Sequence, residues 1–395
     1  MIKRPVIGIP FNYDESWIGG TYYIKNLVSS LKLVDESVRP EVWIISHSEK
    51  SFDFIRRSTG YLNLHWTKPE LIKGIDGGIS RRIKYLSWLT PWFRKQEFQF
   101  DMIFPYPIDK TMQQTVCWIP DFQDKRLPGF FDASELAARE QQHREYFTSY
   151  KHVLFSSDAA RHDFEEFYPE ADVQKHVVQF ATFEQSDGKA DHLEVLKKYD
   201  LDRRFFYCPN QFWVHKNHEV VIDAVQLLKK RGVEVVVAFS GKEHDHRAPD
   251  HTKKLKDKVA QLGLSQNVVF LGFIPREDQM VIFKEAVSIV QPSLFEGWST
   301  VIEDAKSVSQ YVIASAIPAN MEQAKENIEF FNPNAAFDLA AIMEKYASID
   351  PERKIIDYGQ CQREFALSFM RVVTSLMRSV NAGARRASDS VRQKN

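Results

Sequence analysis

The stretch of sequence that decides the fold is QPSLFEGWSTVIEDAK, which occupies residues 291–306. It begins at the end of an apolar run that predicts a buried strand, and a helix is expected to begin near Ser299 or Thr300. The loop between the strand and the helix carries an acid, Glu296, followed by a glycine, Gly297. Backbone N–H groups at the start of a helix lack intrahelical partners, so this arrangement suits a bound phosphate.

Outward from this stretch, the chain shows two series of short apolar strands that alternate with helical patterns. The first series opens with Val6–Pro10 and the second with Phe205–Cys208, and the polar segment between them has its best linker candidate at 185–189. Strands that alternate with helices predict a mostly parallel sheet covered on both faces. Two such halves predict two Rossmann-like α/β domains that face each other across a cleft, with ligands at the carboxyl ends of the strands.

The composition limits the class of protein. The length of 395 residues fits two large domains better than one. Lys and Arg total 52 while Asp and Glu total 53, and the formal net charge of −1 argues against a nucleic-acid partner. The three cysteines form neither a disulfide framework nor a zinc motif, which favours a reducing, cytoplasmic location. No stretch approaches the roughly 18 apolar residues that a membrane-spanning helix requires.

Residues 291–306 resemble the signature of retaining glycosyltransferase family 4. In that signature the phrase P-S-x-x-E-G-[FW] follows a strand, and a second acid stands eight positions after the first. The register holds here without a gap from Glu296 to Asp304 and onward to the strand at 312–315. The resemblance extends, in the order typical of the family, through 213–218, 239–242 and 268–273. It implies the GT-B fold, an α/β architecture of two Rossmann-like domains facing across a cleft.

The resemblance also implies roles for the charged side chains. Lys216 stands where the family places its diphosphate-binding lysine, and a lysine near a helix N-terminus stabilises the charge that develops on this leaving group. Glu296 is implied to contact the donor sugar. The second acid, which accepts hydrogen bonds from the ribose hydroxyls, corresponds by register to Asp304, although Glu303 lies next to it. Neighbouring helical residues point about 100° apart, so only one of the two acids can face the ligand squarely.

Further donor-binding residues follow from the same resemblance. Gly19 and Gly20 look like the family's glycine loop, in which the missing Cβ lets the backbone approach a phosphate or the acceptor. Gln211 stands where many relatives carry an arginine, which removes one positive charge from the diphosphate site. The expected donor-binding set is completed by residues of the loops and of the helix start, namely Gly241, Gly297, Trp298, Ser299 and Thr300.

In the N-terminal half, Asp121 follows a predicted strand and has two possible roles. It is a candidate catalytic acid that orients the acceptor, and equally a residue that caps its own loop. Many relatives have a histidine where this chain has Pro120, so a histidine-dependent step at this position is excluded. Retention is usually explained for the family by same-face attack, in which the leaving phosphate helps deprotonate the acceptor. The sequence shows no hydrolase-like carboxylate pair and no DxD motif after a strand, so neither a metal nor a cofactor is expected.

These inferences predict a domain plan and a function. The plan has an acceptor-binding domain over 1–182, a linker over 183–204, a nucleotide-sugar-binding domain over 205–350, and a crossing helix with a tail over 351–395. The expected function is retaining transfer of a sugar from a nucleotide-diphosphate sugar to a glycan or lipid-linked acceptor, in polysaccharide or glycoconjugate synthesis. The alternatives are a sugar-nucleotide epimerase of the same fold and a catalytically silent binding subunit of a glycan-assembly complex, which Gln211 and Pro120 make plausible.

Residues 79–95 leave a question of membrane contact open. The segment combines five cations with Trp88, Trp92 and Phe93. Such a composition suits an anionic membrane surface, where a lipid-linked acceptor would be found at the inner face of a membrane. It suits equally well an amphipathic helix that packs on the N-terminal sheet and keeps its cations in solvent.

Overall fold

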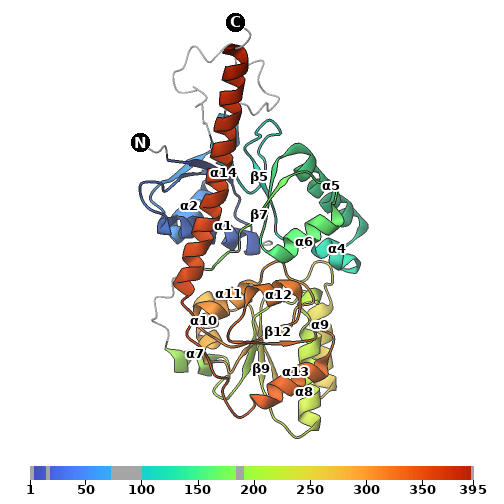
Figure 1. Cartoon of the computed structure of the whole chain (residues 1–395). Coiled ribbons are helices and arrows are strands. Elements are labelled where there is room, and N and C mark those ends of the chain that lie inside the picture. The colour runs from blue at the N-terminus through green and yellow to red at the C-terminus, as the bar shows by residue number, and fades with distance from the viewer. Residues whose placement is uncertain (1–3, 15–17, 73–99, 184–190, 393–395) are drawn as a thin grey trace.

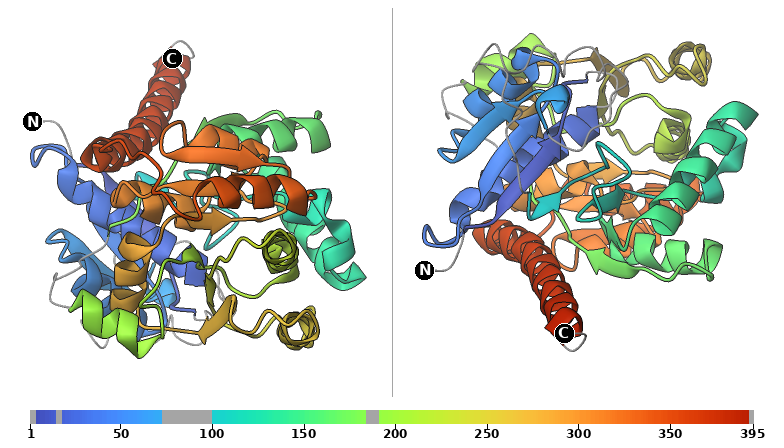
Figure 2. Two further views of the ribbon diagram at one scale, coloured as in Figure 1. Left: turned by 90° about the horizontal axis from the view of Figure 1, so that it is seen from below. Right: turned by 90° about the horizontal axis from the view of Figure 1, so that it is seen from above.

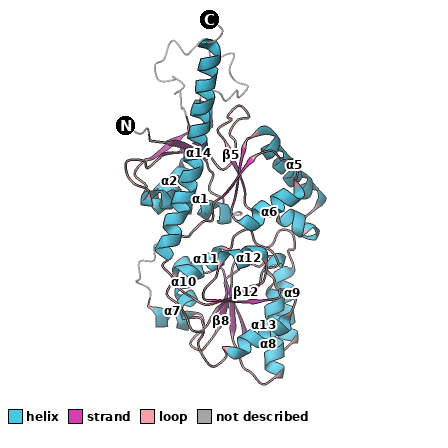
Figure 3. Cartoon of the chain, in the orientation of Figure 1, coloured by secondary structure: helices cyan, strands magenta, loops and turns pink. Residues whose placement is uncertain are grey.

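The computed structural model describes residues 4–14, 18–72, 100–183 and 191–392, with side chains described as far as residue 378. Two α/β domains lie one above the other, and a long helix at the C-terminal end of the chain runs along the upper one (Figure 1). In each domain the strands are enclosed between helices (Figure 3). The segment at 79–95, with its two predicted interpretations, lies outside the described residues.

The N-terminal domain is built on parallel strands. They pair in the orders β3-β2-β1-β4 and β5-β6-β7, and a bridge between Ile103 and Thr115 links the two sets. The strands are β1 (Val6–Pro10), β2 (Glu41–Ile45), β3 (Leu64–Thr67), β4 (Met102–Ile103), β5 (Val116–Ile119), β6 (His152–Phe155) and β7 (Gln174–Val177). The helices between them are α1 (Ile18–Ser30), α2 (Glu49–Thr59), α4 (Gln123–Arg126), α5 (Ala133–Ser149) and α6 (Asp158–Phe167), with short 3₁₀ turns at Leu31–Leu33, Pro69–Leu71 and Pro128–Phe130.

The C-terminal domain has one parallel sheet in the order β10-β9-β8-β11-β12-β13. Its strands are β8 (Phe206–Cys208), β9 (Val237–Ser240), β10 (Val268–Gly272), β11 (Ile289–Gln291), β12 (Val312–Ser315) and β13 (Ile328–Phe331). The helices are α7 (His192–Lys198), α8 (His218–Lys230), α9 (His251–Gln261), α10 (Arg276–Glu285), α11 (Thr300–Ser307), α12 (Pro318–Gln323) and α13 (Ala336–Lys345). The strand order reverses between β8 and β11, and such a switch point is where ligands bind in open α/β sheets.

Two apolar cores hold this sheet between its helices. Residues of α8, α9 and α13 pack on one face, and residues of α7, α10 and α11 pack on the other. The strands are therefore buried on both sides and read as continuous apolar runs, as expected for a parallel sheet. This packing leaves the loops at the strand ends to carry the polar residues.

The last helix, α14 (Tyr358–Arg392), returns from the C-terminal domain to the N-terminal one. Phe365, Phe369 and Val373 are buried in the same core as residues of β1 and α1. The views of Figure 2 place α14 at the side of the N-terminal elements, in agreement with its contacts to α1. None of the helices in the described part of the chain combines the length and apolar character needed to cross a bilayer. The predicted boundaries at residues 182, 204 and 350 stay predictions.

Candidate functional site

The loops after β8 and β11 meet above the switch point of the C-terminal sheet. The loop after β8 ends in a 3₁₀ turn, η5 (Val214–Lys216), and Asn217 then adopts a left-handed conformation with φ 56°, which asparagine tolerates better than most residues. The Asn217 side chain donates to the carbonyl oxygen of Pro292 at 3.1 Å. The Leu294 N–H donates to the carbonyl oxygen of His215 at 2.8 Å. These bonds fix the two loops against each other.

Lys216 and Glu296, which are 80 residues apart in the sequence, form an ion pair at this junction. Lys216 Nζ lies 2.5 Å from Glu296 Oε1. The side chains are 18% and 10% exposed, so the pair is largely shielded from water. A charge-assisted hydrogen bond in such a setting is stronger than a neutral one. The structure thus brings together the two residues that the sequence analysis assigned to the diphosphate and the donor sugar.

The N-terminal domain meets the Glu296 loop through Pro120 and Asp121. Gly297 has no side chain, and a Cβ there would lie 2.3 Å from the carbonyl oxygen of Pro120 and 2.7 Å from Asp121 Cβ. Burial is the largest cause that raises the pKa of Asp121, and the negative charge of Glu296 raises it further, while Arg139 and Lys216 act against the rise. Asp121 Oδ1 also accepts the N–H of Gln123 at 3.0 Å, so the capping role predicted as an alternative is present as well.

The two neighbouring acids of α11 point to different partners. Ser299 caps this helix by accepting the N–H of Ile302. Glu303 is fully buried, and its Oε2 accepts from the hydroxyl of Tyr358 at 2.7 Å. The same hydroxyl accepts the N–H of Thr182 at 2.8 Å. Glu303 therefore lies at the place where the chain crosses between the domains.

Asp304 pairs instead with a residue on the neighbouring helix α10. Its Oδ1 lies 2.6 Å from Arg276 Nη2, and the Asp304 side chain is 8% exposed. A second guanidinium nitrogen of Arg276 donates to Gln279 at 2.6 Å. Arg276 begins α10, directly after the loop that follows the carboxyl end of β10. Its partner Asp304 therefore lies on the side of the domain where ligands bind in open α/β sheets.

The remaining predicted donor-binding residues have varied surroundings. Trp298 is buried in the core of the N-terminal domain, and its indole N–H donates to the carbonyl oxygen of Phe180 at 3.0 Å. Gly241 allows close packing, because a Cβ there would lie 2.3 Å from the carbonyl oxygen of Asn210. Thr300 is exposed and Gln211 is partly exposed. Gly19 and Gly20 lie in the first turn of α1 and not in a loop, so the glycine loop expected there differs from the structure.

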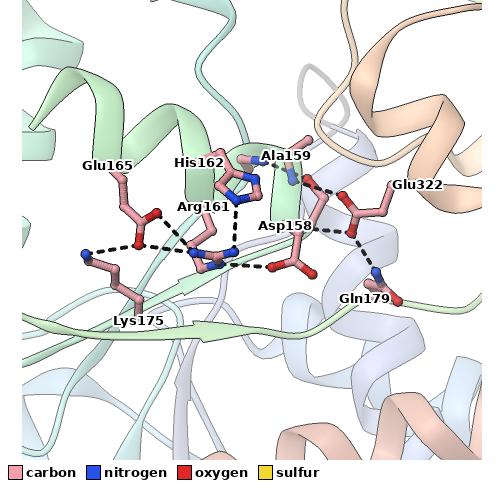
Figure 4. A network of polar contacts seen from close by, with 10 residues as sticks. Asp158, Ala159, Arg161, His162, Glu165, Lys175, Gln179 and Glu322 are labelled. Carbon is pink, nitrogen blue, oxygen red and sulfur yellow. Dashed lines mark hydrogen bonds and ion pairs between the residues drawn. The ribbon is translucent and has the colours of Figure 1, made fainter.

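Polar contacts also close the two domains on one another around this site. Glu322 of α12 accepts the N–H groups of Asp158 at 2.8 Å and of Ala159 at 2.9 Å, and the side chain of Gln179 donates to it at 2.6 Å (Figure 4). The first two donors are the free N–H groups at the start of α6, where a carboxylate is favourable. Elsewhere at the interface, Arg247 binds Glu135 with two hydrogen bonds, at 3.1 and 2.5 Å.

Three residues near the predicted set were missed by the sequence analysis. Asn210 and Gln291 form hydrogen bonds beneath Glu296, and Arg276 pairs with Asp304. A polar residue at the end of an otherwise apolar strand was the only signal for Gln291. Within the described ranges, no three His, Cys, Asp or Glu side chains are grouped so that they could hold a metal ion. The expectation of a reaction without metal or cofactor stays a prediction.

Residues 193–360, which include Lys216, Glu296 and Asp304, match the family model described as Glycosyl transferases group 1. Over these residues the chain is similar to the group 1 glycosyltransferases. The glycosyltransferase MJ1607 of Methanocaldococcus jannaschii is 27% identical over 128 residues, which are 32% of this chain and 31% of that protein. The serotype-specific mannosyltransferase WbdA of Escherichia coli is 27% identical over 164 residues, which are 40% of this chain and 19% of WbdA. The matched segment thus spans less than a third of either relative.

The fold of the chain is similar to solved structures over nearly its whole length. The structure of HepE from Anabaena in complex with UDP and glucose has a TM-score of 0.59 at 14% identity, and the alignment covers 97% of this chain and 100% of HepE. The likeness confirms the predicted α/β architecture of two Rossmann-like domains in the GT-B arrangement. At this identity it speaks for the fold alone.

Proposed function

We propose that this protein transfers a sugar, with retention, from a nucleotide-diphosphate sugar to a glycan or lipid-linked acceptor in polysaccharide or glycoconjugate synthesis. The observation that carries the proposal is the shielded Lys216–Glu296 pair at the switch point, with Asp121 of the other domain next to the same loop. The relatives support it, since WbdA is named a mannosyltransferase and HepE binds UDP and glucose. A cytoplasmic location with contact to the inner face of a membrane fits this proposal.

Each residue has a task in the proposed reaction. Negative charge develops on the diphosphate as the bond to the sugar breaks, and the Lys216 ammonium and the start of α11 stabilise that charge. Glu296 binds the donor sugar and orients it. Asp121 binds the attacking hydroxyl of the acceptor, and its raised pKa makes it a stronger proton acceptor than an ordinary carboxylate.

The proposal is tested with a panel of sugar nucleotides, including UDP-glucose and GDP-mannose, and the nucleoside diphosphates derived from them. A ligand that binds only the folded state raises stability by about 2.7 kcal/mol at a hundredfold excess over its Kd, which a thermal-shift assay detects. The expected result is a shift with one sugar nucleotide, and transfer of its sugar once an acceptor is added. Epimerisation of the donor without acceptor would favour the epimerase. Absence of binding and turnover across the panel would favour the silent binding subunit.

We also propose that Asp304, and not Glu303, binds the ribose hydroxyls, and this assignment has its own expected result. Wild-type protein is expected to bind 2′,3′-dideoxy-UDP or dideoxy-GDP more weakly than the parent nucleotide by about tenfold or more. A carboxylate that accepts hydrogen bonds from the ribose hydroxyls loses these bonds when the hydroxyls are missing. In Asp304→Ala this preference disappears. Glu303→Gln keeps the preference, since Glu303 lies at the domain crossing. Isothermal titration calorimetry measures both Kd values, and the reverse pattern would assign the ribose to Glu303.

A further inference from the structure

Two buried amides lie directly beneath the carboxylate of Glu296. Gln291 ends β11 and is completely buried, and Asn210, just after the neighbouring strand β8, is 2% exposed. The Gln291 amide nitrogen donates to Glu296 Oε1 at 2.8 Å and to the Ser293 hydroxyl at 3.2 Å. The Gln291 amide oxygen accepts from Asn210 Nδ2 at 2.9 Å. Glu296 is thus connected to the interior of the sheet as well as to Lys216.

The direction of these hydrogen bonds follows from chemistry. An ionised carboxylate has acceptors only, so the Gln291 atom that faces Glu296 is the nitrogen. The Gln291 oxygen then faces Asn210, whose side-chain nitrogen is the matching donor. Each bond in such a chain polarises the next in the same sense. Both N–H groups of Gln291 and its oxygen are therefore committed, and the amide has one favourable orientation.

We propose that Gln291, held by Asn210, is a positioning residue that fixes the carboxylate of Glu296 for the donor sugar. The proposal rests on the proposed function, since it assigns Gln291 an effect only through Glu296. Gln291 is fully buried and does not touch the substrate. Lys216 alone leaves the carboxylate free to rotate about the ion pair, whereas a second donor to the same oxygen from below restricts it. An apolar residue would fill this strand position without the desolvation penalty of an amide.

The alternative is that the amide pair only ties β8 to β11. The two interpretations are separated by comparing a sugar nucleotide with its own nucleoside diphosphate, because only the first contains the sugar that Glu296 is proposed to bind. The probes are UDP-glucose with UDP and GDP-mannose with GDP, and the pair that the wild type binds is carried forward. The measured quantity is the ratio of the two Kd values, which reports the contribution of the sugar.

Gln291→Met, which keeps the length of the side chain and removes its polar atoms, is expected to reduce this sugar contribution about tenfold while the Kd of the nucleoside diphosphate stays unchanged. Glu296→Ala is expected to remove the contribution, and adding Gln291→Met to it changes nothing further, because one residue acts through the other. A purely structural role of Gln291 predicts equal losses for both ligands, or effects that add in the double variant, and either result overturns the proposal.

Gln310→Met is the matched control. Gln310 is also a buried glutamine of the C-terminal domain, and its amide nitrogen donates to the carbonyl oxygens of Phe283 at 2.7 Å and Ala286 at 2.9 Å. Gln310 and Ala286 precede the amino ends of β12 and β11, whereas the site follows the carboxyl end of β11. It is expected to lose thermal stability as Gln291→Met does, but to keep the wild-type ratio of Kd values. A ratio reduced equally in both variants overturns the positioning role. If wild-type protein binds no member of the whole sugar-nucleotide panel, the proposed function itself fails, which is a different outcome.

Discussion

Replacing Lys216 with methionine is expected to slow sugar transfer by about two to three orders of magnitude, the effect typical of removing one group that stabilises charge in a transition state. The Lys216 ammonium lies 2.5 Å from Glu296 and is mostly shielded from water, so its field acts through a medium less polarisable than solvent. The charge on the diphosphate grows as the sugar leaves. Lys216 therefore stabilises the transition state more than the bound donor, and the rate falls more than the affinity does.

Single-turnover transfer at saturating donor measures this effect, and the Kd of the nucleoside diphosphate is followed alongside it. Lys258→Met is the matched control, because Lys258 is also partly buried and forms ion pairs with Glu219 at 2.7 Å and Asp223 at 2.6 Å in the same domain. The control is expected to transfer sugar at the wild-type rate. Wild-type transfer in Lys216→Met would contradict the assigned role, and an equal loss in both variants would point to a general loss of structure.

The sequence was sufficient to predict the two-domain α/β fold and, through the family resemblance, to assign both Lys216 and Glu296 to the donor site. Both residues follow apolar strands, and the carboxyl ends of parallel strands lie at one edge of a sheet. To locate the site, the sequence had to show which loops after the strands carry its residues, and the motif around Glu296 identified one of these loops. The ion pair between Lys216 and Glu296, 80 positions apart, was not itself predicted, because it depends on β8 and β11 being neighbours in the sheet.

The roles of Glu303 and Asp304 could not be separated from the sequence. Adjacent helical residues differ only in direction, and that direction depends on how α11 packs against distant segments. Tyr358 at the start of α14 donates a hydrogen bond to Glu303, and Arg276 at the start of α10 forms an ion pair with Asp304. Neither partner is close in the sequence to α11.

Other differences between the predictions and the structure also arise from tertiary packing. Gly19 and Gly20 have low helix propensity and suggested a loop, yet they lie in the first turn of α1, whose later residues pack into the N-terminal core. The Asn210–Gln291 pair depends on β8 and β11 being neighbours in the sheet, which strand order along the chain does not reveal. Trp298 was assigned to the donor, but it also joins the core of the opposite domain.

Gly297→Ala is expected to reduce sugar transfer by about ten- to a hundredfold by opposing closure of the domains. The added Cβ would lie 2.3 Å from the carbonyl oxygen of Pro120, and a backbone atom cannot move away as the end of a flexible side chain can. Overpacking of this kind costs about 1–3 kcal/mol. Because Pro120 belongs to the other domain, separating the domains relieves the clash without unfolding either one.

Transfer kinetics and small-angle X-ray scattering test this expectation together. Gly297→Ala should retain nucleoside diphosphate binding, since Lys216 and Asp304 lie on the C-terminal domain, while its radius of gyration increases. Glu322→Gln removes the charge that binds the start of α6, and so weakens domain closure at a distance from Glu296. Like Gly297→Ala, it is expected to lower the transfer rate and to increase the radius of gyration, but by less. Gly129→Ala is the control, because a Cβ there meets nothing within 4 Å. Full transfer by Gly297→Ala would show that the closed contact between Gly297 and Pro120 is not required during the reaction.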